Sequence, residues 1–200
     1  GEVSHVLLQV GINDFDTSGL GMGIYQNNIP TDQMMGALGY IASNIVTAAE
    51  RVRDTGRCHI LIAATQDYIL LPIVPEVLLQ YNDPAGQERT HAAFVALNDM
   101  TRALAEIAGI DYFDFNQRML AMLDAYSVDE TALLIDGVRV ELLQRGDSGQ
   151  FGLLDDAYVH PGTVLSAFFA NIYLAELNQR YGTAFPLLSN QEILAAAGLR

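Results

Sequence analysis

Short apolar runs alternate along this chain with longer segments in which apolar residues return every three or four positions. Uninterrupted apolar runs are typical of strands buried on both faces, and the helical period indicates helices with one buried face. The runs predict strands at residues 3–10, 57–65 and 110–115. The periodic segments predict helices at residues 31–54, 86–108, 116–126 and 163–181, with a short helix within 186–200. The alternation predicts an α/β fold in which a parallel sheet carries helices on both faces.

The two longest early helices each have an apolar stripe that is expected to face the core. In the first helix the stripe consists of Met34, Leu38, Ile41, Ile45 and Ala48 or Ala49. In the second it consists of Phe94, Leu97, Met100, Leu104 and Ile107. Both sets follow the spacing of a helix with one buried face.

Polar residues and glycines mark the expected helix ends. The predicted N-caps are Thr31 or Asp32, Thr163 and Ser189, and Glu192 completes a capping box with Ser189. The predicted stops are Gly56, Gly109 and Gly182. Between helices, Asp136-Gly137 is a strong two-residue hairpin signal within residues 132–143. Residues 12–30 and 66–84 have no clear period and are expected to be long loops.

Composition narrows the classes of function. A chain of 200 residues that is 50% hydrophobic suits one packed domain covering residues 1–200. The net charge is −14 and all ten basic residues are arginine, so a phosphate backbone would be repelled and nucleic acid is not an expected partner. No apolar run is long enough to span a bilayer. No metal-ligand spacing and no phosphate-binding glycine loop are present, so neither a metal nor a cofactor is expected.

The first predicted strand opens almost at Gly1, which is not a methionine. Natural chains rarely begin within an element, so we expect a preceding N-terminal piece, including at least one strand of the sheet.

The loop after this strand has the residues of an oxyanion site. Gly11 permits a sharp exit from the strand, and Asn13 offers an amide that can stabilise developing negative charge without titrating. Asp14 is expected to hold the loop by accepting backbone N–H bonds. The alternative is an ordinary strand-to-loop turn, in which Gly, Asn and Asp are common.

The second candidate loop contains His160. It is the one histidine of the sequence that follows nearby carboxylates in an expected loop, here Asp155 and Asp156. A carboxylate fixes the tautomer of an imidazole and stabilises its protonated form, as a general base requires. The alternative is a surface histidine beside two solvated acids.

Together the strings Val10-Gly11-Ile12-Asn13-Asp14 and Leu154-Asp155-Asp156-Ala157-Tyr158-Val159-His160-Pro161-Gly162 resemble the SGNH/GDSL family of serine esterases and lipases. The resemblance implies a flavodoxin-like, three-layer α/β/α fold and ester hydrolysis through an acyl-enzyme. It makes Asn13 an oxyanion donor, Gly11 and Asp14 shapers of its loop, and His160 the general base. It also suggests a secreted or periplasmic protein.

The sequence departs from that family at two points. The family places the orienting Asp three residues before the His, where this chain has Ala157; Asp156, four before, is the preferred candidate, and Asp155 is the other. The family's nucleophilic serine lies upstream of the Gly-x-Asn-Asp block and is therefore expected before Gly1. Ser148, in a Gly-Asp-Ser string, neither follows a strand nor opens a helix and is disfavoured.

The predicted function is therefore hydrolysis of a small-molecule or lipid ester. The two long loops would line an apolar acyl pocket, and Asp67 and Tyr68 are candidate pocket residues. The alternative is a non-catalytic binding domain of the same fold.

Overall fold

The computed structural model describes residues 3–15, 19–71, 82–129, 132–141 and 160–199. Internal contacts group the chain into two compact units. The first holds the described residues up to 116, and the second holds those from 117 onward. The single domain expected from the sequence stays a prediction.

The first unit contains a parallel three-stranded sheet. Its strands are β1 (His5–Leu8), β2 (His59–Ala63) and β3 (Asp111–Phe113), in the order β1-β2-β3. The helices α2 (Thr31–Arg53) and α4 (Pro84–Ala108) connect successive strands. The predicted α/β alternation is thus confirmed for this part of the chain.

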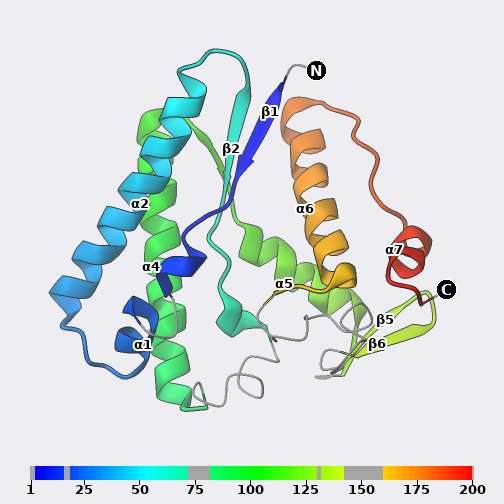
Figure 1. The fold of residues 1–200 in the computed structure, drawn as a ribbon, viewed down its shortest axis with the longest axis horizontal. Coiled ribbons are helices and arrows are strands. Elements are labelled where there is room, and N and C mark those ends of the chain that lie inside the picture. The colour runs from blue at the N-terminus through cyan, green and yellow to red at the C-terminus, as the bar shows by residue number, and fades with distance from the viewer. Residues whose placement is uncertain (1–2, 16–18, 72–81, 130–131, 142–159, 200) are drawn as a thin grey trace. The chain divides into compact units, whose positions relative to one another are not determined.

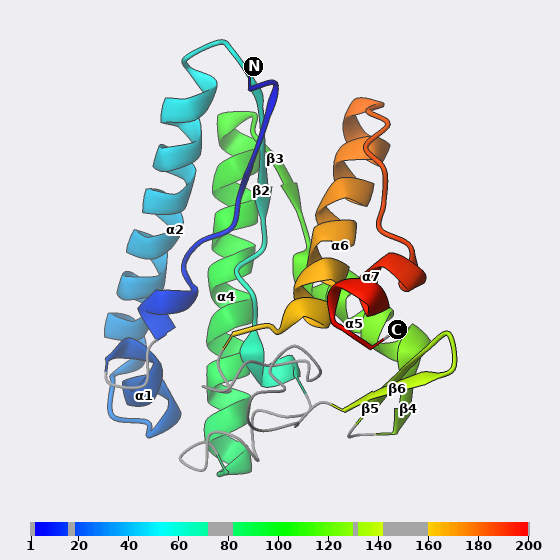
Figure 2. The same ribbon diagram turned by 45° about the vertical axis from the view of Figure 1, so that its right-hand side comes forward.

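Both connecting helices pack on the same face of this sheet. The register sets Val6 beside Ile60 and Leu8 beside Ile62, and all four side chains join one cluster with residues of α2 and α4. Two right-handed crossovers that advance in one direction put their helices on one face, as is found here. Figures 1 and 2 show α2 and α4 side by side.

The apolar stripe of α2 was predicted correctly, whereas that of α4 was wrong at its end. In α2 the buried residues include Leu38, Ile41, Ile45 and Ala49. In α4, Phe94 and Leu97 are fully buried, but Ile107 is 84% exposed. Ile107 lies ten residues beyond Leu97, about 80° off its direction at 100° per residue, so it falls outside the buried face.

The glycine stops were predicted better than the N-caps. Gly109 and Gly182 are the left-handed C-caps of their helices, both at φ 66°. Pro30 and Gly162 are the N-caps of α2 and of the helix beginning at Thr163, and neither makes a side-chain cap bond. The predicted caps Thr31, Asp32 and Thr163 are therefore wrong, because these residues lie within the first turn of their helices.

The segment expected to be one long loop contains two short helices. The 3-10 helix η1 (Ile12–Phe15) follows β1, and α1 (Leu20–Tyr25) precedes α2. The helix α1 is held by α4: Arg89 donates to the carbonyl oxygens of Ile24 and Tyr25, and the Tyr25 ring lies where a Cβ on Gly86 would stand. Tertiary contacts thus stabilise a helix in a segment whose sequence has no helical period.

The second predicted loop, residues 66–84, contains the short 3-10 helix η2 (Tyr68–Leu70). Its residues 72–81 lie outside the described residues.

The second unit combines helices with a small antiparallel sheet, visible in Figure 2. Its elements are α5 (Phe115–Tyr126, whose first two residues belong to the first unit), β4 (Ser127–Asp129), β5 (Ala132–Ile135), β6 (Val138–Glu141), α6 (Thr163–Tyr181) and α7 (Asn190–Ala196). The predicted hairpin is confirmed, with Asp136 and Gly137 both at positive φ (47° and 80°), as a type I′ turn requires. The capping box of Ser189 and Glu192 is confirmed as well.

Within the described residues, no helix has both the length and the apolar character needed to cross a bilayer.

Candidate functional site

The turn after β1 is shaped by Gly11. This residue has φ 106°, a conformation that side-chain-bearing residues rarely adopt, so the predicted sharp exit is confirmed. A Cβ at this position would stand 2.8 Å from Oγ1 of Thr65. The Thr65 hydroxyl donates to the carbonyl oxygen of Val10 at 2.8 Å. Glycine is therefore required both by the backbone conformation and by the close approach of the neighbouring strand end.

Asn13 lies on η1 with its side chain at the surface. The Asp14 N–H closes the turn on the Gly11 carbonyl at 3.1 Å, and the Asp14 side chain is exposed. Phe15 is 2% exposed and stacks on Phe94 with ring centroids 4.0 Å apart. The buried ring anchors the short helix, so the Asn13 amide is presented to solvent from a fixed backbone.

Thr65 ties the end of β2 to two helices. Its N–H donates to Oδ1 of Asn98 at 2.8 Å, and its carbonyl accepts from Nδ2 of Asn98 at 3.0 Å. The same carbonyl accepts from Nδ2 of Asn116 at 3.0 Å, and Oδ1 of Asn116 accepts from the N–H of Asp67 at 2.9 Å. These bonds satisfy the backbone beyond the sheet and make this edge rigid.

Asp67 forms a close pair with His91 of α4. Its Oδ2 lies 2.5 Å from Nδ1 of His91, and its Oδ1 accepts from the N–H of Ile69 at 3.0 Å. The Asp67 side chain is 2% exposed, whereas that of His91 is 43% exposed. Burial raises the pKa of Asp67, and the hydrogen bond and charge of His91 and the Ile69 N–H act in the opposite direction. Asp67 thus contacts a histidine, and the pocket expected at Asp67 and Tyr68 stays a prediction.

This arrangement suits proton transfer. A carboxylate that accepts the Nδ1 proton of an imidazole fixes the tautomer in which Nε2 is an acceptor. It also stabilises the imidazolium that forms when Nε2 takes a proton. His91 therefore has the features of a general base, with a buried partner on one ring nitrogen and a partly exposed ring.

The pair and the Asn13 turn are joined by aromatic packing within the first unit. The Tyr68 hydroxyl donates to the carbonyl of Phe15 at 3.4 Å, and its ring meets Phe94 edge-on at 5.2 Å. Phe94 lies about one turn after His91 on α4, and its ring stacks on that of Phe15. A shift of the turn that carries Asn13 would thus disturb the packing beside the Asp67–His91 contact, and a shift of that contact would disturb the turn.

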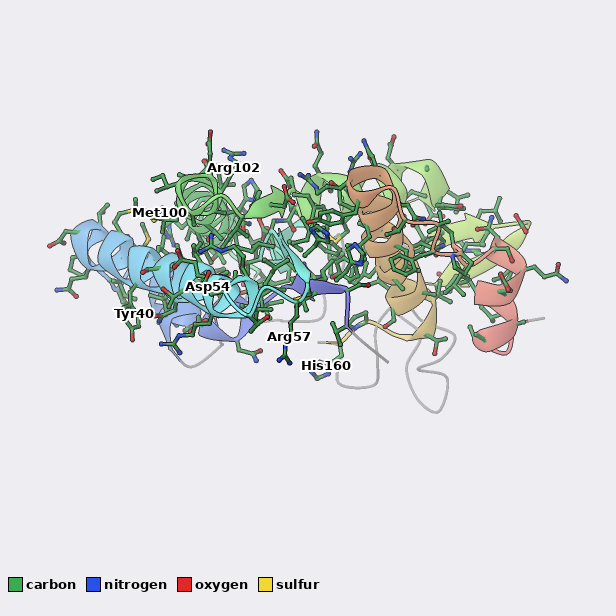
Figure 3. The ribbon with its side chains drawn as sticks, turned by 90° about the horizontal axis from the view of Figure 1, so that it is seen from above. Tyr40, Asp54, Arg57, Met100, Arg102 and His160 are labelled. Carbon is green, nitrogen blue, oxygen red and sulfur yellow. The ribbon has the colours of Figure 1, made fainter. Side chains whose placement is uncertain are left out.

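His160, the general base expected from the sequence, is exposed and lies just before α6, as labelled in Figure 3. Its expected partners Asp155 and Asp156, and the disfavoured Ser148, fall outside the described residues. Asn13 belongs to the first unit and His160 to the second. The common cleft expected for these two residues stays a prediction.

The sequence did not predict the contact between His91 and Asp67, because His91 has the pattern of a surface residue on a helix, three positions from Glu88. The Asp67–His91 pair links residues 24 positions apart, one in a loop and one on a helix. The available signal was a carboxylate directly beyond a buried strand, at the edge where parallel sheets bind ligands.

Neither a protein-family model nor a curated protein nor a solved structure matches the chain. In the described part of the chain, no group of three or more His, Cys, Asp and Glu residues is placed to hold a metal ion. The class of protein is defined by fold and site alone: an α/β protein with a polar, hydrogen-bonded carboxyl edge to its parallel sheet.

Proposed function

We propose that the protein is a serine ester hydrolase of the SGNH/GDSL type, with the three-layer, flavodoxin-like fold of that family. One observation carries the proposal: the Asn13 amide is exposed at the carboxyl end of β1, on a turn fixed by Gly11 and Thr65. Ligands of parallel sheets bind at this edge of the sheet. A neutral donor on a rigid turn is what an oxyanion site needs.

In the proposed reaction the Oγ of a serine attacks the ester carbonyl carbon and loses its proton to a histidine. The carbonyl oxygen becomes an oxyanion, which accepts a hydrogen bond from Nδ2 of Asn13. Collapse expels the alcohol, which takes the proton from the histidine, and leaves an acyl-enzyme. Water then attacks the acyl group with the same histidine as base.

Two histidines are candidates for the base. His160 is favoured by the sequence, with Asp156 as its orienting acid. His91 is favoured by its contact with Asp67, at 2.5 Å from Nδ1, and by its packing link to the Asn13 turn through Phe94. Comparing the esterase activity of His160→Ala with that of His91→Gln distinguishes the two candidates.

Substrates are proposed to be esters with an apolar acyl group, from small molecules or lipids. Val10 and Ile12 flank Gly11 on the turn and are 43% and 37% exposed. Exposed aliphatic side chains beside the Asn13 amide favour an acyl chain over a charged group.

The test is an assay of the full-length protein with p-nitrophenyl butyrate and with a fluorophosphonate probe. We expect Asn13→Ala to lower kcat by about 10²–10³, the range for loss of one oxyanion donor, with the melting temperature unchanged. The matched control is Asn28→Ala, because Asn28 is also exposed and, among the described residues, its side chain bonds only to that of Gln26.

The probe reacts with an activated serine, whose Oγ displaces fluoride from phosphorus. Mass spectrometry of the labelled peptide identifies the nucleophile. Loss of labelling and turnover in His160→Ala assigns the base to His160, and loss in His91→Gln assigns it to His91. A wild-type protein with no turnover and no labelling would overturn the proposal and favour the binding-domain alternative.

A further inference from the structure

The turn that follows β2 is held from two sides by side chains that bond to its backbone. Thr65 and Asp67 are 2% and 1% exposed, so their backbone polar groups have almost no access to water and need partners within the protein. Those partners come from α4 and from Asn116, which lies on the first turn of α5 and belongs to the same compact unit. Asn116 is itself buried, and the proposed reaction assigns it no role.

The helix α4 contacts this turn at two points. Asn98 bonds to both backbone groups of Thr65, and Nδ1 of His91 lies 2.5 Å from Oδ2 of Asp67. His91 and Asn98 are seven residues apart, which is close to two full helical turns, so they lie on one face of α4. The helix that carries the imidazole is therefore also fastened to the turn by a contact that does not involve the carboxylate.

Asn116 bonds to the same two residues from the end of the neighbouring strand. Its Nδ2 donates to the carbonyl of Thr65 at 3.0 Å, and its Oδ1 accepts from the N–H of Asp67 at 2.9 Å. The Thr65 carbonyl thus accepts from both asparagines, which uses both lone pairs of its oxygen. Among the described residues, the N–H of Asp67 has no acceptor other than Asn116.

The direction of the Asp67 carboxylate depends on this backbone bond. Oδ1 accepts from the N–H of Ile69 at 3.0 Å, so a local turn fixes the carboxylate relative to the backbone of Asp67. That local bond does not fix the carboxylate relative to α4. The bond from Asn116 supplies this constraint, because it holds the Asp67 backbone where Oδ2 faces Nδ1 of His91.

We propose that Asn116 is a positioning residue, which holds Asp67 so that its carboxylate keeps the imidazole proton of His91 on Nδ1 and leaves Nε2 as the acceptor. A neutral imidazole in this tautomer is the form that a general base needs. Asn116 acts through Asp67 alone and makes no hydrogen bond to the imidazole. Its value to catalysis rests on the proposed function, in which His91 is one of two candidate bases.

Nitrogen NMR of the full-length protein tests this role, because the chemical shifts of Nδ1 and Nε2 distinguish the two tautomers. At a pH where the imidazole is neutral, we expect wild type to have His91 almost entirely with its proton on Nδ1. We expect Asn116→Ala to give a mixture of tautomers, because the carboxylate no longer has a fixed direction. Hydrogen exchange at the Asp67 N–H should become about tenfold faster in this variant, as for loss of one hydrogen bond. His91→Gln identifies the signal.

The matched control is Asn98→Ala. This variant also removes two hydrogen bonds from the same turn, but both are bonds to Thr65 and neither is a bond to Asp67. A general loosening of the turn would change the tautomer of His91 equally in the two asparagine variants. We expect His91 in Asn98→Ala to keep the wild-type tautomer, and the Asp67 N–H to exchange at the wild-type rate.

Three results would overturn the role of Asn116. The first is a wild-type His91 with its proton on Nε2 or on both nitrogens, a result that does not depend on the folding of any variant. The others are an unchanged tautomer in Asn116→Ala and an equal change in both asparagine variants. Turnover of p-nitrophenyl butyrate is measured separately. A wild-type protein without turnover would overturn ester hydrolysis, whereas the tautomer of His91 would still decide whether Asn116 positions the pair.

Discussion

The carboxylate of Asp67 lies 2.5 Å from Nδ1 of His91, although the two residues are 24 positions apart. The Asp67 side chain is 2% exposed, so the imidazole is its main source of compensation for lost hydration. The contact joins the loop after β2 to the third turn of α4. It is at once a structural tie and an arrangement suited to proton transfer.

The first prediction concerns the pH dependence of stability in Asp67→Asn. Burial raises the pKa of Asp67 in the folded protein above its model value of 3.8. A carboxyl group of this kind contributes stability that is fully present below the unfolded pKa and is lost as pH rises through the folded pKa. The free energy of unfolding of wild type, relative to Asp67→Asn, should therefore fall as pH rises above 3.8.

Urea unfolding of both proteins across the acidic and neutral range measures this difference. Titrating groups that do not contact Asp67 are shared by the two proteins, so their contributions cancel to first order. His91 contacts Asp67, so its contribution is part of the measured difference. If the difference in unfolding free energy rises with pH, or does not change, the effect of His91 on the pKa of Asp67 outweighs that of burial.

The second prediction concerns Gly11→Ala. The substitution forces an alanine into φ 106° and brings its Cβ to 2.8 Å from the Thr65 hydroxyl. We expect a loss of about 1–3 kcal/mol in the free energy of unfolding, as for other strained backbone positions. The control is Gly36→Ala, because Gly36 is on α2 with nothing within 4 Å of its Cβ position and should gain about 0.5–1 kcal/mol. Equal effects at both positions would contradict the strain argument.

The third prediction concerns the asparagine pairs of α6. Asn178 donates to the carbonyl of Phe185 and accepts from its N–H, and Asn171 makes the same two bonds with Leu188, all at 2.8 Å. Asn178→Ala removes both bonds to Phe185, and Asn171→Ala removes both bonds to Leu188. At about 0.5–1.5 kcal/mol for each hydrogen bond, Asn171→Ala should lose about 1–3 kcal/mol of unfolding free energy. Asn178→Ala also removes the bond that its Oδ1 accepts from the Thr183 hydroxyl, so it should lose about 1.5–4.5 kcal/mol.

Gln179→Ala, at an adjacent exposed position, should be near neutral. Chemical denaturation measures all three, and a loss in Gln179→Ala equal to the others would argue against the pairs.

The fourth prediction concerns the capping box of α7. Oγ of Ser189 accepts from the N–H of Glu192 at 3.2 Å, and Oε2 of Glu192 accepts from the N–H of Ser189 at 2.8 Å. Ser189→Ala should cost about 0.5–2 kcal/mol. The backbone and hydroxyl hydrogen bonds of Ser189 lower the pKa of Glu192 below its model value of 4.5.

Because the folded-state pKa of Glu192 is lowered, its contribution to stability changes with pH in the opposite direction to that of Asp67. The stability from Glu192 is present above the unfolded pKa of 4.5 and is lost as pH falls through the folded pKa. The difference between wild type and Glu192→Gln should therefore shrink as the solution is acidified below pH 4.5. Thermal melts at several acidic pH values test this trend, and a constant difference would mean that the carboxylate is not held by Ser189.

Elements with strong local signals could be predicted from the sequence. The helix α6 ends where it was predicted to end, because an uninterrupted helical period stops at a glycine that adopts the left-handed conformation. The hairpin at Asp136-Gly137 was predicted because the two residues tolerate the positive φ of its turn. The sharp turn at Gly11 could be predicted for the same reason, because a glycine directly after an apolar strand tolerates positive φ. The oxyanion role of Asn13 stays a prediction.

Features that depend on distant contacts could not be predicted. The sequence of α1 has two glycines and no clear period, and its helix is stabilised by Arg89 and by close packing at Gly86. The Asp67–His91 pair forms only when α4 packs on the sheet and is rotated about its axis so that His91 faces the loop after β2. The error at Ile107 has a different origin: ten residues after Leu97 it already points about 80° away at the ideal helical period, so the sequence alone could have excluded it.

The asparagine pairs also determine how the segment at residues 183–189 meets a protease. Endopeptidases bind a substrate as an extended strand and form hydrogen bonds to its main-chain N–H and C=O groups. At Phe185 and Leu188 these groups are already bound to Asn178 and Asn171, so an enzyme must first displace the side chains. An irregular surface segment with two exposed leucines, Leu187 and Leu188, is thereby protected from cleavage for as long as α6 stays folded.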